Sequence, residues 1–325
     1  MQMTSLGRRG PLVSAVGYGS WAISGMDWGQ TEDEISKRAL HAALDAGVNF
    51  IDTADNYGRG HSEELIAEVL EERGGREGIV IATKACNDFY NATDDDDLGY
   101  GPIRTNTDRD YIIFAAEQSL RRLKTDCLDI LQLHSPGTED LDRDDPWEAL
   151  ATLKQQGKIR HAGWSVRSFC ETEQTFLLKR HADLIDVIQV RHNLLERGAE
   201  EALFPAAMRH GTGVIVRSPI LFGFLTGKFT RETRFGDDDH RRMNLSPEKI
   251  DAYLRQLEDL QWLFDEFPDQ TMAQVALRFT ISHPACHTVI PSGKTPEQVS
   301  ENSRAGEIGP LPPTTCERLG LPVLT

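Results

Sequence analysis

The sequence is poor in the features that mark secreted, zinc-binding and membrane-spanning proteins. Its five cysteines, Cys86, Cys127, Cys170, Cys286 and Cys316, are scattered and form no C-x-x-C pair. That pattern argues against a disulfide framework or a zinc site and favours the reducing cytoplasm. No apolar run is long enough to span a bilayer, and the opening MQMTSLGRRG lacks the apolar stretch of a signal peptide.

Positive charge is also scarce. The chain has 35 Lys and Arg against 51 Asp and Glu, so its formal charge is 35 − 51 = −16. Nucleic acids and anionic membranes repel a protein this acidic, so we expect neither as a partner. The run of four aspartates at residues 94–97 is expected to be solvated surface and not a metal site, because nothing in the sequence fixes its geometry. No Pro-, Gly- or Ser-rich linker divides the chain, which predicts one domain over residues 1–325.

Eight short apolar segments alternate with longer polar ones. Most are continuous apolar runs, as expected for parallel strands that are covered on both faces. The expected strands are residues 15–19, 48–52, 79–84, 128–134, 160–165, 186–190, 213–218 and 287–292, preceded by a candidate β-hairpin at residues 3–14.

The segments between the strands carry helix signals. Thr31 with Glu34 and Thr295 with Gln298 have the spacing of a capping box, and Thr107 is a candidate N-cap. The helices expected from these and similar signals are residues 31–47, 62–75, 107–125 and 295–305.

Strands that alternate with helices imply βαβ units and a parallel sheet, and eight of them predict a closed (β/α)8 barrel. Two connections are longer than a barrel needs, residues 85–106 after the third strand and residues 221–244 after the seventh. Both follow a strand, so both belong to the rim where barrel enzymes bind substrate. We therefore predict an α/β single-domain barrel with an N-terminal hairpin and two extended loops on that rim.

Polar side chains recur where the expected strands end. In a barrel these ends share one rim, and a buried unpaired charge costs several kcal/mol. Their recurrence therefore indicates a site and not core packing. The residues are Asp52, Lys84, His134, Ser165, Gln189 and Arg217.

Tyr57, five residues after Asp52, completes a set with a defined chemistry. A nearby Lys84 ammonium favours tyrosinate and so lowers the phenol pKa from about 10, and Asp52 keeps that ammonium charged. His134 can hydrogen-bond a substrate oxygen. Together the four residues suit proton donation to an oxygen that gains negative charge, which is what carbonyl reduction by a hydride-carrying cofactor requires.

Seven longer motifs carry a family resemblance. They are GVNFIDTADNYGRGHSEELIAEVL, IVIATK, SLRRLKTDCLDILQLHSP, GKIRHAGWS, IQVRHNLLER, SPILFGFLTGKF and IPSGKTPEQVSEN, in this order. Over nearly its whole length the sequence resembles the aldo-keto reductases, in particular bacterial-type members. The resemblance implies a monomeric (β/α)8 barrel without a Rossmann domain, which reduces an aldehyde or ketone with NADPH. Tyr57 would be the general acid, Lys84 and Asp52 would tune it, and His134 would orient the carbonyl.

The resemblance also implies a set of cofactor contacts. The chain departs from the family pattern at Val166, where asparagine is usual, at Arg217, where many relatives have tyrosine, and at Gln298, where arginine is usual. The last departure leaves use of NADH open beside NADPH/NADP⁺. Lys294 and the helix start beside it suit a ribose 2′-phosphate. The implied cofactor-binding residues are Ser165, Gln189, Arg217, Ser218, Leu221, Gly223, Lys228, Ser292, Lys294, Gln298, Glu301 and Asn302.

The small-molecule carbonyl substrate itself is not readable from the sequence. Aromatic residues of the rim would shape its pocket, namely Trp21, Trp28, Phe89 and Tyr90. Two other functions stay open. One is a Schiff-base lyase that uses Lys84, which a neighbouring Asp52 disfavours. The other is a cofactor-binding regulatory subunit with little turnover.

Overall fold

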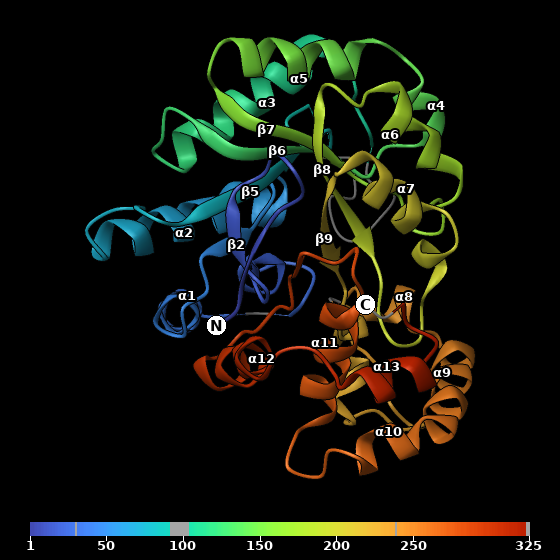
Figure 1. Ribbon diagram of the computed structural model, residues 1–325. Coiled ribbons are helices and arrows are strands. Elements are labelled where there is room, and N and C mark those ends of the chain that lie inside the picture. The colour runs from blue at the N-terminus through green and yellow to red at the C-terminus, as the bar shows by residue number, and fades with distance from the viewer. Residues whose placement is uncertain (30, 92–103, 238, 323–325) are drawn as a thin grey trace.

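Eight parallel strands form the centre of the molecule. The computed structural model describes residues 1–29, 31–91, 104–237 and 239–322. In it the strands pair in the order β10-β9-β8-β7-β6-β5-β4-β3. Helices surround these strands (Figure 1). The amides of Gly17 and Gly19 donate to the carbonyls of Val289 and Pro291 at 2.8 and 3.1 Å, which joins the first strand to the last. The predicted (β/α)8 barrel is therefore confirmed.

The elements alternate as the sequence predicts. The strands are β1 (Met3–Ser5), β2 (Leu12–Ser14), β3 (Tyr18–Gly19), β4 (Phe50–Asp52), β5 (Val80–Ala85), β6 (Leu128–His134), β7 (Ile159–Ser165), β8 (Ile185–Arg191), β9 (Gly213–Arg217) and β10 (Thr288–Val289). The α-helices are α1 (Asp33–Asp45), α2 (His61–Glu72), α3 (Arg109–Arg122), α4 (Thr138–Leu141), α5 (Asp145–Gln155), α6 (Leu177–Arg180), α7 (Leu203–His210), α8 (Arg241–Asn244), α9 (Pro247–Asp259), α10 (Gln261–Asp265), α11 (Met272–Ser282), α12 (Pro296–Ile308) and α13 (Pro313–Arg318). Short 3₁₀ turns follow several strands, namely η1 (Trp21–Ile23), η2 (Tyr57–Gly60), η3 (Glu173–Phe176), η4 (Gly198–Glu200) and η5 (Leu221–Thr226).

The predicted N-terminal hairpin is β1 paired antiparallel with β2, and it closes one end of the barrel. Leu6 and Val13 of the hairpin are fully buried in one cluster with Phe50, Ile130 and other inward side chains of the strands. The contact is close enough to require glycine in β9, because a Cβ on Gly213 would lie 2.7 Å from the Leu6 carbonyl oxygen. The base of the barrel is therefore a packed apolar plug.

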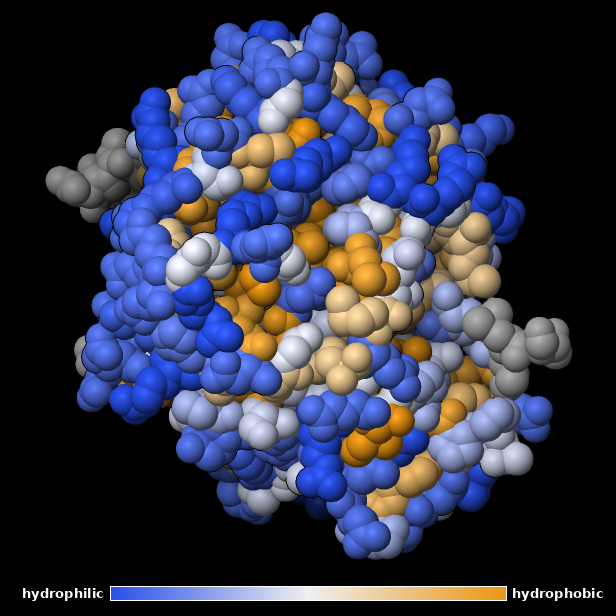
Figure 2. Space-filling model, turned by 60° about the vertical axis from the view of Figure 1, so that its left-hand side comes forward, coloured by the Kyte–Doolittle hydropathy of each residue, from blue (hydrophilic) through white to orange (hydrophobic). Residues whose placement is uncertain are grey.

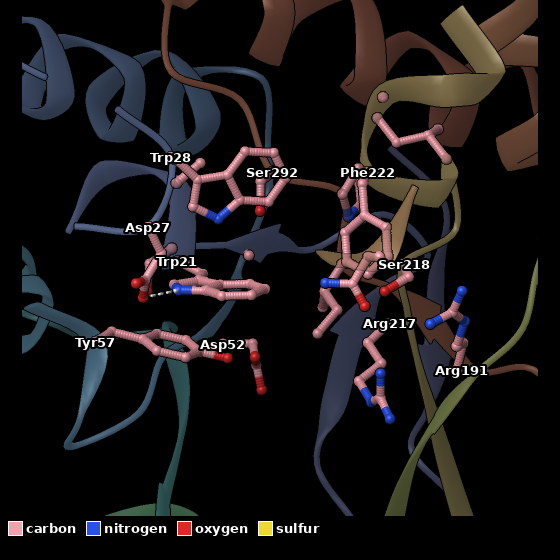
Figure 3. A pocket seen from close by; sticks show the side chains of 18 of the residues that line it. Trp21, Asp27, Trp28, Asp52, Tyr57, Arg191, Arg217, Ser218, Phe222 and Ser292 are labelled. Carbon is pink, nitrogen blue, oxygen red and sulfur yellow. Dashed lines mark hydrogen bonds between the residues drawn. The ribbon is translucent and has the colours of Figure 1, made fainter. Parts of the chain in front are cut away.

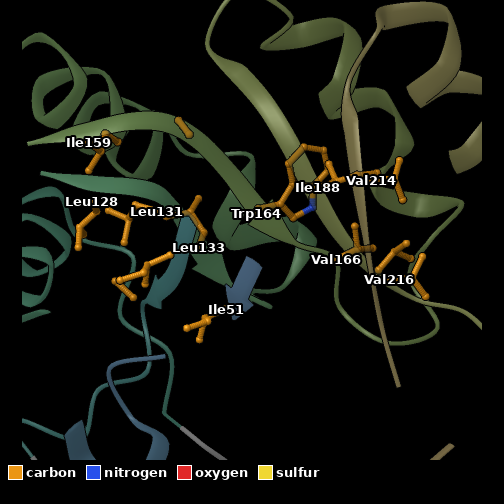
Figure 4. Packing of buried hydrophobic residues seen from close by; sticks show 14 of the residues in the cluster. Ile51, Leu128, Leu131, Leu133, Ile159, Trp164, Val166, Ile188, Val214 and Val216 are labelled. Atoms are coloured by element: carbon orange, nitrogen blue, oxygen red, sulfur yellow. The ribbon is translucent and has the colours of Figure 1, made fainter. Parts of the chain in front are cut away.

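A second apolar layer separates the strands from the helices around them. Leu131 and Leu133 alternate along β6 with the inward Ile130, and they pack with Trp164 of β7 and Ile188 of β8 (Figure 4). Both faces of the sheet are thus buried, which explains the continuous apolar runs in the sequence. The outer face of the helices is hydrophilic, and Figure 2 shows polar side chains covering most of one side of the molecule.

The long connection after β9 is a folded subregion and not a simple loop. It runs from the end of β9 to the start of α11 and contains η5, α8, α9 and α10. Phe224 of η5, Leu257 of α9 and Leu263 of α10 share a separate apolar cluster with Phe279 of α11. The predicted long connection over residues 221–244 is therefore in the right place, but it is not a simple loop, since η5 packs in one apolar cluster with α9, α10 and α11.

Most of the other predicted loop, after β5, lies outside the described residues, and the four-aspartate run lies there too. None of the helices in the described part of the chain is long and apolar enough to cross a membrane.

Two predicted helix caps are wrong by one residue. The N-cap of α1 is Glu32 and not Thr31, and the N-cap of α3 is Asp108 and not Thr107. Neither threonine caps its helix. The Thr107 hydroxyl accepts a hydrogen bond from Arg143 at 3.4 Å, and the Thr31 hydroxyl is buried and forms no hydrogen bond with the described residues. The cap at Thr295 is confirmed, since its hydroxyl accepts from the Gln298 amide.

The carboxylate of Asp186 links the hairpin to the base of the barrel. Its oxygens lie 2.8 Å from Arg9 Nε and 2.6 Å from Lys154 Nζ, and its side chain is 1% exposed. Burial acts to raise the pKa of Asp186, but hydrogen bonds from His161, Lys154 and the Ala162 amide lower it to about 2. Since an unfolded aspartate titrates near about 3.9, this carboxylate stabilises the fold at neutral pH, and that contribution is lost as the pH falls toward 2.

We expect Asp186→Asn to lower the free energy of unfolding by about 2 to 3 kcal/mol at pH 7, because it leaves two cations without their buried partner. Urea unfolding at pH 7 measures the change, and the difference from wild type should shrink at low pH. Asp183→Asn in the turn before β8 is the control, since Asp183 is exposed. Equal losses in the two variants would contradict this role for Asp186.

Candidate active site

A cavity of about 1030 Å³ opens at the carboxyl ends of the barrel strands. One wall carries Tyr57, Trp21 and Trp28, and the opposite wall carries Arg217, Ser218 and Phe222 (Figure 3). Although the chain is acidic, the cavity lining is basic. Against four acidic side chains, Asp27, Asp52, Asp88 and Glu301, it presents eight basic ones, Arg59, Arg104, Arg167, Arg191, Arg217, Lys228, Arg241 and Lys294. This excess of positive charge favours an anionic occupant.

The floor of the cavity is polar because the inward side chains of several strands change from apolar to polar above the apolar base of the barrel. Inward positions recur every second residue along a strand. On β4 the inward Phe50 is followed by Asp52, and on β6 the inward Ile130 is followed by Gln132. The same change from apolar to polar occurs on β5, β8 and β9, from Ala82 to Lys84, from Val187 to Gln189 and from Ile215 to Arg217.

Lys84 is not among the residues that line the cavity, but it is bonded to two of them, Asp52 and Tyr57. It is 0% exposed, and its ammonium donates to Asp52 Oδ1 at 2.6 Å, to the Thr53 carbonyl at 2.7 Å and to the Tyr57 hydroxyl oxygen at 3.4 Å. Burial acts to lower the pKa of Lys84, but the Asp52 carboxylate and the Tyr57 phenol raise it above its usual value. The lysine therefore stays protonated at neutral pH.

Two buried side-chain amides donate hydrogen bonds to Asp52. Its second oxygen accepts from Gln189 Nε2 at 2.6 Å and from Gln132 Nε2 at 3.4 Å. The structure thus places Gln189 in the cavity wall with its amide nitrogen already bonded. Gln132 was not predicted from the sequence, although its position two residues before His134 on the same strand was a usable signal.

Tyr57 follows β4 in η2 and projects into the cavity (Figure 3). Its ring stacks on Trp21, with the ring centroids 5.8 Å apart and the planes 16° from parallel. Burial raises the pKa of Tyr57 above its usual value, and the Lys84 ammonium opposes that rise. The predicted direction of the Lys84 effect is therefore right, but burial outweighs it in the protein alone, and the phenol keeps its proton at neutral pH.

His134 faces Tyr57 from the end of β6. The two ring centroids are 5.8 Å apart and the planes are 77° from parallel. Burial, assisted by the charges of Lys84 and Arg217, lowers the pKa of His134 well below its usual value, so the imidazole is neutral at pH 7. Its Nδ1 lies 2.9 Å from the amide nitrogen of Asn87, a residue that the sequence did not single out.

Aromatic side chains from two rim segments form the mouth of the cavity. Trp21 and Trp28 follow β3 and lie 4.4 and 4.3 Å, centroid to centroid, from the His240 ring of the β9 connection. Trp28 also pairs with Asp239 through the backbone, which ties the two segments together. Phe89 lines the cavity as predicted, but Tyr90 does not, because its hydroxyl is turned away and accepts from Arg122 Nη2 at 2.7 Å.

The segment after β9 approaches the cavity in a strained conformation. Ser218, Leu221 and Phe222 have φ of 55°, 47° and 55°, values that non-glycine residues rarely adopt. Ser218, Gly223 and Lys228 line the cavity as predicted, whereas the side chain of Leu221 is buried in the apolar cluster behind it. Strain of this kind occurs mainly where backbone groups are held for a ligand.

Arg217 stands where many members of the family have tyrosine. Arg217 donates to the Val166 carbonyl at 3.1 Å and to Ser168 Oγ at 2.9 Å, so it reaches across to the segment after β7. The Val166 side chain is fully buried and apolar, and Ser165 beside it lines the cavity. Arg191, another residue that the sequence analysis missed, lines the cavity as well.

Three side chains hold the guanidinium of Arg191 in place. It forms an ion pair with Glu196, and its guanidinium lies 5.0 and 5.2 Å from the ring centroids of Phe169 and Phe222. Its position two residues after Gln189 on β8 was the available signal. A planar cation fixed in this way suits contact with an anion or a flat group.

The segment after β10 forms the far end of the cavity, where Ser292, Lys294, Gln298, Glu301 and Asn302 line the wall. The Gln298 side chain accepts from the Lys294 amide at 2.8 Å and not from Thr295, so the predicted capping box is only half formed. The Lys294 ammonium donates to the Trp28 carbonyl, which links this segment to the mouth. In the described ranges no three His, Cys, Asp or Glu side chains are grouped to hold a metal ion.

Known proteins of the same architecture are similar to the chain over almost all of its length. The aldo/keto reductase family model matches residues 15–319. Aldo-keto reductase YhdN of Bacillus subtilis is 32% identical over 92% of this chain and 87% of its own. A probable voltage-gated potassium channel subunit beta of Arabidopsis thaliana is 29% identical over 96% of this chain and 93% of its own. The solved structure of the glycerol dehydrogenase AKR11B4 from Gluconobacter oxydans superposes with a TM-score of 0.80 at 28% identity, covering 98% and 93% of the two chains. With its barrel, its polar floor and this match to the family model, the chain belongs to the aldo/keto reductase family.

Proposed function

We propose that the protein reduces an aldehyde or ketone to the alcohol, reversibly, with NADPH as hydride donor and Tyr57 as general acid. Members of its family carry out oxidoreduction of small carbonyl compounds. The observation that carries the finer proposal is the contact between the Lys84 ammonium and the Tyr57 hydroxyl oxygen, 3.4 Å apart on the floor of a basic cavity. In this contact the phenol oxygen accepts, so its own proton is free to pass to a substrate.

The four polar residues divide the work between them. Tyr57 donates its proton to the substrate oxygen as negative charge develops there. Lys84, held charged by Asp52, stabilises the tyrosinate that remains. His134 is neutral and donates a second hydrogen bond to the same oxygen, which fixes the carbonyl and stabilises its charge.

The rest of the cavity fits a nicotinamide dinucleotide. When bound, the cofactor supplies the hydride. Ser165, Gln189 and Arg217 would hold the nicotinamide end, and the segment from Ser218 to Lys228 would hold the pyrophosphate. The strained backbone and the basic lining support this orientation.

The far end of the cavity favours NADPH over NADH. Lys294 would bind the ribose 2′-phosphate at the start of α12, where a capped helix N-terminus adds positive potential. Gln298, Glu301 and Asn302 would contact the adenine side. Gln298 offers a weaker phosphate contact than arginine would, so NADH remains a second, poorer cofactor.

Both alternative functions receive less support. A Schiff-base lysine needs a lowered pKa, whereas Asp52 and Tyr57 raise the pKa of Lys84. A regulatory subunit with little turnover is suggested by the relatives named as potassium channel subunits, but it gives no reason for a protonated tyrosine and a neutral histidine to meet beside a buried lysine.

Tyr57→Phe should lower kcat for carbonyl-dependent NADPH oxidation by about 10²- to 10⁴-fold, because the proton donor is lost. Cofactor binding, measured by nicotinamide fluorescence, should change little. Tyr253→Phe is the matched control, since its hydroxyl donates to Glu196 outside the cavity lining. Full activity of Tyr57→Phe across a panel of aldehydes, ketones and sugars would contradict the role of Tyr57 as proton donor, whereas little turnover of the wild type with every member of the panel would favour the regulatory subunit.

The rate of reduction should be nearly constant from about pH 6 to about pH 9. The raised pKa of Tyr57 keeps the acid protonated over this range, and the lowered pKa of His134 keeps the imidazole neutral. Activity should fall only above about pH 10, as the phenol loses its proton. Profiles of kcat/KM measured in overlapping buffers test this, and a step centred near pH 6.5 would be inconsistent with a neutral His134.

Lys294→Ala should raise KM for NADPH by about 10- to 100-fold while leaving KM for NADH nearly unchanged, because one charge-assisted contact to the 2′-phosphate is lost. Lys228→Ala should weaken both cofactors alike, since the pyrophosphate is common to them. Initial rates with each cofactor measure the two ratios. An equal loss for NADPH and NADH in Lys294→Ala would place the 2′-phosphate elsewhere.

A further inference from the structure

Asn87 lines the cavity beside His134 and contacts its imidazole. It lies two residues beyond β5 and is 4% exposed. Its amide nitrogen is 2.9 Å from His134 Nδ1. An amide NH₂ can only donate, so in this contact Nδ1 accepts and carries no proton.

The imidazole is uncharged in this environment, which makes the contact informative. Tyr57, Lys84, Cys86 and Arg217 are the titratable or charged groups that face His134, and none of them supplies a negative charge at neutral pH. A neutral imidazole has one ring proton. With Nδ1 accepting from Asn87, that proton resides on Nε2.

The backbone around Asn87 holds the amide in place. Cys86, between β5 and Asn87, has φ of 109°, a conformation that costs energy for any residue with a side chain. Several bonds offset that cost. The Tyr111 hydroxyl donates to the Asn87 carbonyl at 2.8 Å, the Asn106 amide donates to the Cys86 carbonyl at 2.8 Å, and Asn87 pairs with Thr105.

From this geometry we infer that Asn87 is a positioning residue that fixes His134 as the Nε2–H tautomer and so directs its single proton toward the substrate oxygen. The inference rests on the proposed role of His134 in carbonyl reduction. It explains why a polar amide, and not an apolar side chain, occupies a buried place beside the floor. Without the Asn87 donor the ring could hold its proton on Nδ1 and offer the substrate a lone pair.

The tautomer can be measured without reference to activity. ¹⁵N-histidine NMR of the wild-type protein at pH 7 should show His134, assigned by its disappearance in His134→Gln, as the Nε2–H form. Asn87→Asp should convert it to the Nδ1–H form at high pH and to imidazolium at lower pH, because a carboxylate accepts a hydrogen bond from Nδ1–H and stabilises the cation. Wild-type His134 protonated on Nδ1, or an unchanged tautomer in Asn87→Asp, would overturn the inference.

Kinetics give the second readout. Asn87→Asp should lower kcat for reduction by about 10²-fold at pH 9, the size of effect seen when one donor to a developing oxyanion is lost. The rate should recover as the pH falls and Nε2 regains a proton in the imidazolium, while wild type stays flat. Tyr111→Phe is the control, since it removes a neighbouring bond and leaves the Asn87 amide in place, so the tautomer should not change. If Tyr57→Phe proves fully active, the proposed function fails while the NMR result for Asn87 still stands.

Discussion

The buried ammonium of Lys84 is the constraint on which the cavity floor depends. Removing an ion from water costs several kcal/mol, and only close partners offset that cost. Here they are the Asp52 carboxylate, the Thr53 carbonyl and the Tyr57 hydroxyl. Asp52 in turn needs donors for its second oxygen and finds them in Gln189 and Gln132. The Tyr57 hydroxyl lies beside the Lys84 ammonium because this buried cation needs protein atoms as hydrogen-bond acceptors.

Much of this arrangement could be predicted from the sequence, for a definite reason. Parallel strands covered on both faces appear in the sequence as continuous apolar runs, so all eight strands could be recognised. The polar residue at the end of a run then marks the rim of the barrel. Asp52, Lys84, Tyr57 and His134 could therefore be placed together before any coordinates. Gln132 and Arg191 also point into the barrel. They could have been found from the two-residue alternation of inward side chains, since Gln132 follows Ile130 on β6 and Arg191 follows Gln189 on β8.

Other features depend on contacts that no local pattern encodes. Asn87 looks like an ordinary loop residue, and its place beside His134 follows from the turn at Cys86 and the bonds from Tyr111 and Asn106. The pairing of Trp28 with Asp239 joins segments more than 200 residues apart. The helix caps at Thr31 and Thr107 were misplaced because both helices begin one residue later, after Glu32 and Asp108, whose side chains form no cap bond among the described residues.

The apolar hairpin under the barrel has a consequence for the order of events. Because Leu6 and Val13 fill one end in the described structure, traffic to the floor passes through the opposite mouth. If the proposed cofactor and the carbonyl substrate both enter through this mouth, the one that binds nearer the floor has to bind first and leave last. The apolar packing that stabilises the base of the barrel would then also set the order of binding and release.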